Sequence, residues 1–516
     1  MAGKVSLSVG SQDADFTTIA EAIKDAPKGA TISIAPGKYS EALTIDTDLT
    51  LIGDGETDAV VISGDVTIGG GRVTIAGCCL SWLGVSAGKP ILTECHIADL
   101  GFSGASAPRL IECRISGAKI QDTAAGVLEN CEIIANGITI TDEATPRLKG
   151  CRVLGSAGVR VSGAAAPVFS GCEIANSTGI GVTISSGAPA FRRCHIHHNA
   201  ANGVSLTGAA AGTLTSCEIS DNGAPGVGVQ GDATTLIKSC QLHDNAGSGV
   251  VIRSGTPTLE SCRLKDHTEP DIVVAGGAPT LTRCKLTGGP ANGVVFLDRA
   301  GGLMDGCDLQ NHALCELVIS GQAAPEIKDC RIHKSQHMGV WITDRARPTL
   351  TGCRILTAAR VGVGISSASP TLKDCRISGH TSNGVTIYNG AKPTLENCEI
   401  SKNVGPDVVI WGEADPTLTS CQISNGKAIG VWVRAGGRGT LNGCEITRSK
   451  VAGLQVDDGA PVLNGCSFVK LPIAARYTGS GGGQLNEATM TDNEQDVVVV
   501  DGPGPKVSSS AAASEE

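Results

Sequence analysis

The amino-acid sequence predicts an all-β solenoid, in which short strands and tight turns wind into a parallel β-helix. The phrase apolar-x-x-Cys-x-apolar recurs along most of the chain, at intervals of 17 or 18 residues at first and of 22 or 23 from Cys172 onward. The segments between the phrases contain glycine-rich turns and show no helical periodicity. A fixed repeat of this length is typical of solenoids, in which each turn of the chain contacts only its neighbours.

The cysteine phrase sets the register of the chain. It contains nineteen of the 21 cysteines, at positions 78, 95, 113, 131, 151, 172, 194, 217, 240, 262, 284, 307, 330, 353, 375, 398, 421, 444 and 466. Each repeat supplies a single cysteine between apolar residues, whereas a zinc site uses paired ligands. We therefore expect a buried structural ladder of thiols. Cys79 and Cys315 lie outside the series, and we expect them to be structural or incidental.

A second strand follows a glycine in most of the later repeats. Examples are GVTI at 181, GVSL at 203, GVVI at 249, GVWI at 339 and GVWV at 430. Alternation along a strand puts the second and fourth residues of each phrase inside and the third outside. Leucine-rich repeats are the alternative solenoid, but their L-x-x-L-x-L-x-x-N signature is absent.

The N-terminal segment differs from the repeats and predicts a helix that covers the first coil. Four apolar residues follow helical spacing, namely Phe16, Ile19, Ala20 and Ile23. Thr18 and Glu21 have the spacing of a capping box, and Pro27 and Gly29 are expected to end the helix. Such a helix would hide a strand edge that could otherwise recruit another chain.

The sequence thus divides into four expected segments. These are an N-terminal cap with a short helix and the first coils (1–66), a β-helix of about nineteen coils (67–475), a C-terminal cap (476–503) and a disordered tail (504–516).

Composition limits the partners and the compartment. The net charge is −10 without large blocks of charge, which argues against nucleic acid or an anionic membrane as the main partner. No apolar run approaches the length of a membrane-spanning helix, and the first residues lack the apolar core of a secretory signal. Single cysteines without such a signal indicate a reducing compartment. We expect a cytoplasmic protein that is a monomer or a weak oligomer.

A family resemblance becomes visible in these residues. The stretch DFTTIAEAIKDAPKGATISIAPGKYSEALTIDTDLTLIGD, residues 15–54, resembles the opening of the pectinesterase and pectin-lyase-like superfamily. The coils that follow are similar to the right-handed parallel β-helix repeats of that superfamily. The resemblance implies a right-handed parallel β-helix over nearly the whole chain. It does not single out an activity, because the superfamily includes lyases, hydrolases, epimerases and non-enzymatic binders.

The catalytic motifs of the superfamily are absent or broken. Gln121-Asp122-Thr123 looks like the start of the pectinesterase Gln-Asp-Thr-Leu motif, but Ala124 replaces the leucine. The downstream nucleophile segment of that family is missing, so Asp122 is a weak catalytic candidate. The motifs of polygalacturonases and alginate epimerases are missing too. We predict no catalytic residue.

Asp457-Asp458 is the best pair of adjacent carboxylates, and Asp457 is the second weak catalytic candidate. The register of the coils places Asp457 beside Arg434 of the preceding coil. An exposed salt bridge along the ladder explains that pair without catalysis. A glycosidase would need a second carboxylate facing the same cleft.

Histidines concentrate in turns, most densely in the HIHHN segment from His195 to Asn199. This cluster could bind a metal ion, but its neighbours supply no cysteine or carboxylate set. Solvated turn residues are the favoured interpretation, and we predict neither a metal nor another cofactor.

Aromatic residues on one predicted sheet face provide the better functional signal. The register brings together Trp341, Tyr388, Trp411 and Trp432 over five coils, with Arg434 beside them. Exposed aromatic rings suit sugar rings or a protein hot spot, and packing beneath a neighbouring loop is the alternative.

Two functions remain open on the sequence. The first is a non-enzymatic scaffold or binding protein that recognises a protein or glycan partner through the aromatic face. The second is a carbohydrate-active enzyme, a polyuronate lyase, hydrolase or esterase, with a diverged active site. The absence of the superfamily's motifs favours the first.

Overall fold

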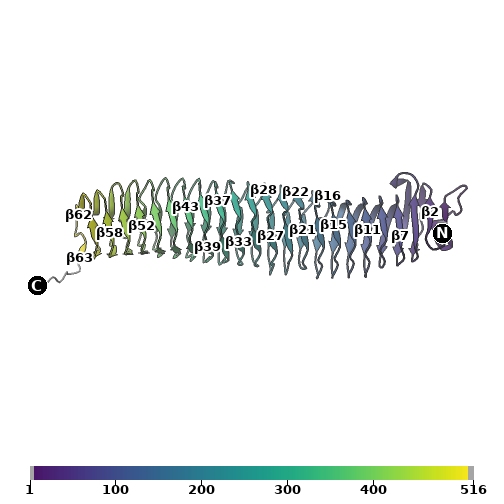
Figure 1. Ribbon diagram of the computed structural model, residues 1–516, viewed down its shortest axis with the longest axis horizontal. Helices are drawn as coiled ribbons and strands as arrows, with labels where there is room; N and C mark the ends of the chain where they lie inside the picture. The colour runs from purple at the N-terminus through teal and green to yellow at the C-terminus, as the bar shows by residue number, and fades with distance from the viewer. Residues whose placement is uncertain (1–4, 509–516) are drawn as a thin grey trace. The chain divides into compact units, whose positions relative to one another are not determined.

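A computed structural model describes residues 5–508 of the chain (Figure 1). The chain divides into two compact units, Met1–Ala246 and Gly247–Glu516, here called unit 1 and unit 2 and each described by itself. Within each unit short strands pair in parallel with the equivalent strands of the next coil. The prediction of an all-β parallel β-helix is therefore confirmed. No helix among residues 5–508 is long and apolar enough to cross a membrane.

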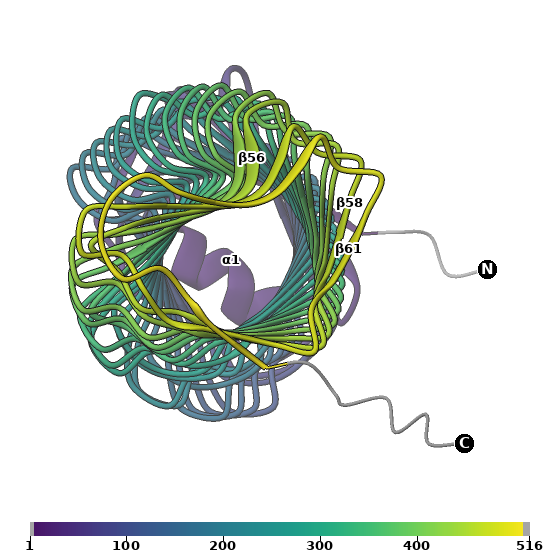
Figure 2. The same ribbon diagram turned by 90° about the vertical axis from the view of Figure 1, so that its left-hand side faces the viewer.

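The helix predicted near the N-terminus is present and caps unit 1. Helix α1 (Ile19–Asp25), labelled in Figure 2, packs against the first strands of unit 1. Its side chains Ile19 and Ala22 are buried. The Thr18 side chain accepts a hydrogen bond from the Glu21 amide, as one half of the predicted capping box. The carboxylate of Glu41 accepts two more bonds, at 2.8 Å each, from the first amides of the helix. These acceptors satisfy N–H groups that have no partner inside the helix.

A mature coil contains three strands, one more than the sequence indicates. One such coil in unit 1 consists of β24 (Thr213–Thr215), β25 (Glu218–Ser220) and β26 (Val227–Val229). The cysteine phrase forms two of these strands, because Ser216, just before Cys217, has a φ of 52°. A left-handed residue cannot continue a strand, so the chain turns there. Equivalent positions hold Gly, Asn, Asp or another residue with positive φ in other coils.

The alternation predicted for the glycine-led strand is confirmed. In β23 (Val204–Leu206) the first and last residues are buried, and Ser205 between them is partly exposed. The same pattern holds in β47 (Val385–Tyr388), where Val385 and Ile387 are buried. Branched apolar side chains thus fill the interior of each coil, and the intervening residues form outward-facing columns.

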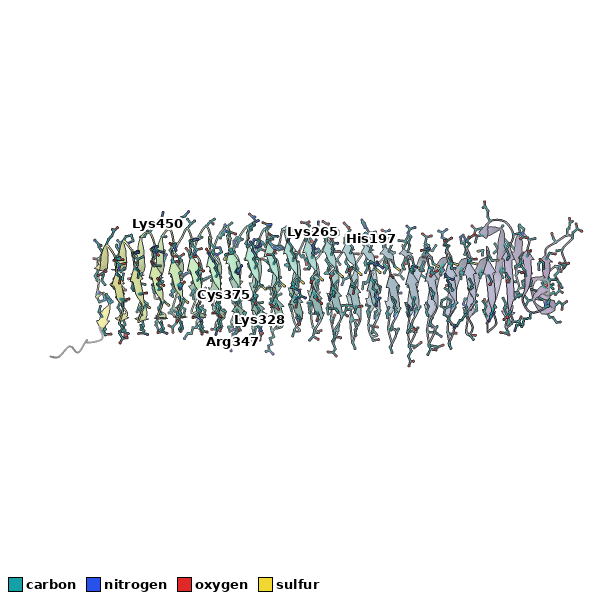
Figure 3. The ribbon with its side chains drawn as sticks, in the orientation of Figure 1. His197, Lys265, Lys328, Arg347, Cys375 and Lys450 are labelled. Carbon is teal, nitrogen blue, oxygen red and sulfur yellow. The ribbon has the colours of Figure 1, made fainter. Side chains whose placement is uncertain are left out.

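The ladder cysteines lie buried at the turn between two strands. The Cys375 sulfur (Figure 3) lies 3.5 Å from the Leu350 carbonyl oxygen of the preceding coil and 3.3 Å from the Lys373 carbonyl oxygen. These contacts suit a weak S–H donor in an apolar setting. Burial raises the pKa of the Cys78 thiol to about 12, which disfavours the thiolate that metal binding requires.

A ladder of asparagines lines another turn of unit 1 and was not expected from the sequence. Asn199 donates through Nδ2 to Oδ1 of Asn222 at 2.9 Å, and Asn222 donates in the same way to Asn245. The Nδ2 groups also lie within hydrogen-bonding distance of carbonyl oxygens such as Ile196 O, at 3.3 Å. Asn199 and its two successors each lie five residues after a ladder cysteine, and their side chains are buried.

The chain's last strands extend the ladder. Residues 476–503, expected as a C-terminal cap, contain parts of β59 to β62, which pair in parallel with the coil before them: β59 (Ile473–Thr478), β60 (Gln484–Asn486), β61 (Thr489–Thr491) and β62 (Gln495–Val499). The predicted disordered tail, 504–516, begins with a further strand, β63 (Lys506–Ser508), and the rest of it lies outside the described residues.

Replacing Asn222 by alanine is expected to destabilise the protein by about 1–3 kcal/mol, because buried donors and acceptors of Asn199 and Asn245 lose their partner. Chemical denaturation measures the change. The matched control is Ser205→Ala on the neighbouring outward column, which should change stability by less than about 0.5 kcal/mol. Equal effects of the two substitutions would contradict a structural role of the asparagine ladder.

Candidate functional site

The predicted aromatic face lies in unit 2, and the structure places four of its five residues in two contacting pairs. The rings of Tyr388 and Trp411 stack with centroids 5.1 Å apart and an interplanar angle of 3°. The Arg434 guanidinium carbon lies 4.7 Å from the centroid of the Trp432 ring. Trp341, in β41 (Val340–Ile342), instead has Val318 and Gly364 as its neighbours across the sheet.

Asp457 fixes the position of Trp432, the indole that Arg434 contacts. It ends β56 (Ala452–Asp457), and its carboxylate accepts a hydrogen bond from Trp432 Nε1 at 2.6 Å and from Gln455 Nε2 at 2.9 Å. The Thr478 hydroxyl donates to the same carboxylate. Three donors on one carboxylate indicate a positioning role rather than that of a catalytic base.

The prediction of a salt bridge between Arg434 and Asp457 is wrong, although the strand register on which it was based is confirmed. Arg434, at the end of β53 (Ile429–Arg434), pairs with Asp457 across the sheet. The carboxylate nevertheless bonds to Trp432 and its other neighbours, while the guanidinium lies over the indole ring. A cation–π contact and three hydrogen bonds thus replace one exposed ion pair.

The stacking decides what this surface presents to solvent. Tyr388 and Trp411 cover each other's ring faces, and Arg434 covers a face of Trp432. Trp411 nevertheless remains 36% exposed. Ring edges, a guanidinium and part of an indole therefore form the outer surface.

Asp122, the other weak catalytic candidate, is a turn residue of unit 1. Its φ is 56°, and its Oδ2 atom accepts a hydrogen bond from the Gly104 amide at 2.8 Å. The Asp122 amide in turn donates to Asp142 of the next coil at 3.1 Å. Aspartate tolerates this left-handed conformation and satisfies turn amides, so the geometry accounts for Asp122 without catalysis.

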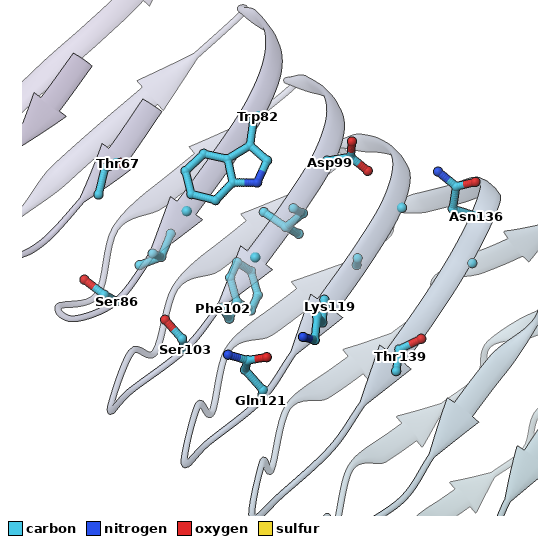
Figure 4. Close-up of a pocket in the computed structure, with 17 residues that line it drawn as sticks. Thr67, Trp82, Ser86, Asp99, Phe102, Ser103, Lys119, Gln121, Asn136 and Thr139 are labelled. Atoms are coloured by element: carbon cyan, nitrogen blue, oxygen red, sulfur yellow. The ribbon is translucent and has the colours of Figure 1, made fainter. Parts of the chain in front are cut away.

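A groove on the outer sheet face of unit 1 was missed by the sequence analysis. Its cavity volume is 550 Å³. Five adjacent strands line it, namely β6 (Val60–Ile68), β8 (Cys79–Val85), β10 (His96–Phe102), β12 (Arg114–Ile120) and β14 (Glu132–Ile140). Figure 4 shows Trp82, Asp99 and Asn136 on one side and Ser86, Ser103 and Gln121 on the other. Lys119 lies between these two sides. Pockets of this volume are typical of small-ligand sites.

The fourth tryptophan, Trp82, lines one side of the groove. A Cβ atom on Gly84 would lie 2.1 Å from Cη2 of Trp82, so the indole occupies the space above that glycine. Gly84 pairs with Gly101 in the next coil, which leaves the backbone beside the ring open. Trp82 is 37% exposed. The strand register could have revealed this arrangement, had the outward columns been followed into the early, shorter coils.

Buried carboxylates form a further cluster in unit 2, outside the expected sites. Asp271 and Glu316 replace the glycine that precedes the strand in other coils, and both approach His312. The His312 Nε2 atom lies 3.1 Å from Asp271 Oδ2, and Nδ1 contacts Glu316. Burial disfavours the imidazolium, but hydrogen bonds to the two carboxylates raise the pKa of His312 to about 9. The cluster is buried, and His312 pairs with both carboxylates. Asp271 Oδ1 has no hydrogen-bond partner among the described residues, so the polar groups of the cluster are only partly satisfied.

Some histidines expected to be solvated are buried. His380 is buried in a turn of unit 2, and His333 is buried at the end of strand β40 (Arg331–His333). His197 (Figure 3), at the end of strand β22 (His195–His197), is only partly covered. Nε2 of His197 lies 3.2 Å from Glu173 Oε1, and Nδ1 lies 2.8 Å from Nδ1 of His198. Within residues 5–508 no three His, Cys, Asp or Glu side chains are placed to hold a metal ion.

Asp407 predicts a dependence of stability on pH. Burial raises its pKa to about 7, and Asn403 donates a hydrogen bond to its Oδ1 atom at 2.7 Å. In the unfolded chain the Asp407 carboxyl ionises near pH 4. Between pH 4 and 7 it therefore loses its proton more readily in the unfolded than in the folded state, and the free energy of unfolding falls as the pH rises. Asp407→Asn removes this titration, and its gain in stability should grow over that window and stay constant above it, reaching a few kcal/mol at most.

Thermal unfolding of wild type and Asp407→Asn at pH 4 and pH 8 measures the effect. The variant should unfold at a higher temperature than wild type at pH 8, with a smaller difference at pH 4. Glu413→Gln, a change at an exposed turn of the same unit, is the control for a general effect of removing a carboxylate. A difference between wild type and Asp407→Asn that is the same at both pH values would contradict the assignment.

The comparisons with known proteins identify the class. Residues 136–279, 272–403 and 361–512 match the family model described as the right handed beta helix region. The chain therefore belongs to that family, and the predicted handedness is confirmed. A comparison of the sequence with curated proteins finds no match.

Solved structures with related folds are distant. A mutant of the PL6 family alginate lyase AlyGC is 9% identical, with a TM-score of 0.32, over 98% of this chain and 100% of that chain. A mutant of the periplasmic alginate epimerase AlgG is 9% identical, with a TM-score of 0.22, over 95% and 82%. A mannuronic acid specific polysaccharide family 6 lyase from human gut microbiota is 8% identical, with a TM-score of 0.25, over 67% and 86%. At these values the likeness carries no argument about activity.

Proposed function

We propose that the chain is a non-enzymatic binding protein that recognises a protein partner through the aromatic face of unit 2. The observation that carries this proposal is the ordered cluster of Tyr388, Trp411, Trp432 and Arg434 on adjacent coils. Tryptophan, tyrosine and arginine are the residues most enriched at protein hot spots.

The arrangement of the rings favours a protein over a glycan at this surface. A sugar binds best across an open ring face, and here Tyr388 and Trp411 cover each other. Ring edges and a guanidinium suit the side chains of a protein. A partner that offers an apolar side chain to Trp411 and a carboxylate to Arg434 fits this surface.

The cluster is also preorganised. Asp457 bonds to Trp432, and Gln455 and Thr478 hold Asp457 in turn. Side chains that are already fixed lose little conformational entropy on binding, which strengthens association. The proposal thus rests on order as well as on composition.

Carbohydrate-active chemistry is the second candidate, as a polyuronate lyase, hydrolase or esterase with a diverged site. The observation in its favour is the groove of unit 1, where Asp99 and Lys119 lie beside the exposed Trp82. An acid and a base in one groove could serve proton transfer. Product formation from pectin or alginate by the pure protein, abolished by Asp99→Asn, would replace the non-enzymatic proposal.

Trp411→Ala is expected to weaken binding of the partner by roughly thirtyfold, the loss typical of a hot-spot residue. The full chain is used to isolate the partner from the native source, and calorimetry with the purified partner then compares the variants. Trp82→Ala, an equally exposed tryptophan in unit 1, is the matched control and should bind like wild type.

Unchanged affinity of Trp411→Ala for the partner would contradict the proposal. A glycan array provides the other decisive outcome. Binding of wild type to a glycan that only Trp411→Ala loses would show that the aromatic face takes a sugar instead of a protein.

A further inference from the structure

We propose that the groove of unit 1 is a second binding site, one that takes a pyranose ring of a neutral oligosaccharide on the face of Trp82. It is separate from the aromatic face of unit 2 and differs from it in the chemistry that it presents. The proposal stands on the shape of the groove, the position of the indole and the state of the polar side chains around it.

The Trp82 indole lies over the backbone of its own strand. The six-membered part of the Trp82 ring lies over Gly84, with three of its carbons 2.1–3.0 Å from the place of a Cβ atom on that glycine. The ring is thus supported by backbone from below and exposed above. Figure 4 shows the ring broadside over the strands. Gly101 is the neighbour of Gly84 in the next coil. An aromatic face of this kind stacks on the C–H face of a pyranose.

The aromatic face of unit 2 presents different ring surfaces. In unit 2, stacking covers one ring face each of Tyr388 and Trp411, and the Arg434 guanidinium covers one face of Trp432. Among the ring contacts between described residues, none involves Trp82. Two tryptophans with nearly the same exposure, Trp82 and Trp411, therefore offer different surfaces.

Four polar side chains around the groove are available to bind a ligand. Asp99, Lys119, Gln121 and Asn136 come from β10, β12, the turn after β12, and β14. Within the described part of the chain their side chains make no hydrogen bond or ion pair, whereas Asp457 and Gln455 of unit 2 bond to each other. Donors and acceptors on both sides of an exposed ring can bond to ring hydroxyls without first breaking a bond inside the protein.

The register places these groups around the ring. Asp99 is the neighbour of Trp82 in the next coil, and Lys119 is the neighbour of Gly101. The groove is therefore open above Gly101 and bounded by Lys119 one coil further on. A carboxylate can accept from two adjacent hydroxyls, while the ammonium and the amides can donate.

The charges decide the class of sugar. Among the described side chains that line the groove, Asp99 is the acid and Lys119 the base. A groove with one charge of each sign has no net charge to offer an acidic or a basic polymer. Hydroxyl groups, which both donate and accept, match such a set, so a neutral hexopyranose is the fitting ligand.

The experiment starts from a glycan array that carries neutral and acidic oligosaccharides. Calorimetry with cellohexaose, laminarihexaose, maltohexaose and a galacturonate hexamer then measures affinity in solution. Wild type should bind at least one neutral hexaose more tightly than the galacturonate hexamer. Trp82→Ala should weaken that binding roughly tenfold through the loss of stacking. Trp411→Ala should bind it like wild type.

A second variant keeps the indole but moves it. In Gly84→Ala the new methyl group meets the far end of the Trp82 ring and displaces it, while the φ of Gly84 is one that alanine accepts. Binding of the neutral hexaose should fall although all four tryptophans are present. Unfolding temperatures close to that of wild type would show that both variants fold.

Three results would overturn the proposal. One is that wild type binds none of the neutral hexaoses. Another is that Trp82→Ala binds them as tightly as wild type. The third is tighter binding of the galacturonate hexamer, which would assign the groove to acidic sugars.

Discussion

The parallel hydrogen-bond ladder between successive coils is the interaction on which the rest of the structure depends. The amide after nearly every ladder cysteine donates to the carbonyl of the cysteine one coil earlier, as Arg376 does to Cys353 at 2.9 Å. This bond repeats coil after coil within each unit, so residues at equivalent positions stack in columns. Inward columns become the buried apolar core, and outward columns become surfaces whose composition the sequence can vary without disturbing the fold. The cysteines belong to the first kind, which explains why their regularity reports the fold rather than a chemical function.

Columns also explain where departures from the repeat have consequences. Where Asp407 replaces the usual glycine, its carboxylate enters the interior and depends on Asn403 for a hydrogen bond. Where Trp82 enters an outward column, it needs the space that Gly84 leaves. A polar residue in the interior thus costs stability unless a neighbouring turn supplies a hydrogen-bond partner. An outward departure leaves stability nearly unchanged and creates a surface feature, and both proposed binding sites are of this outward kind.

The sequence predicted the features that periodicity determines. The helical cap, the burial of the cysteines and the pairing of Arg434 with Asp457 all follow from spacing and are present. The sequence-based predictions failed for features that depend on the conformation of a single side chain or backbone residue. A single left-handed residue such as Ser216 splits each cysteine phrase into two strands, and only the recurrence of Gly, Asn or Asp before the cysteine indicates it. The indole of Trp432 competes successfully for Asp457, which no register can show. The groove at Trp82 escaped because it requires three columns in the early coils to be read together.

Hydroxyl-radical footprinting of the four tryptophans, with and without the neutral hexaose that wild type binds, tests the central claim most directly. The claim is that outward columns with open side chains, and not the repeated interior, form the binding surfaces. The account predicts that the sugar protects Trp82 from oxidation and leaves Trp411 as reactive as before. Protection of Trp411 with no change at Trp82, or no protection of either, would contradict it.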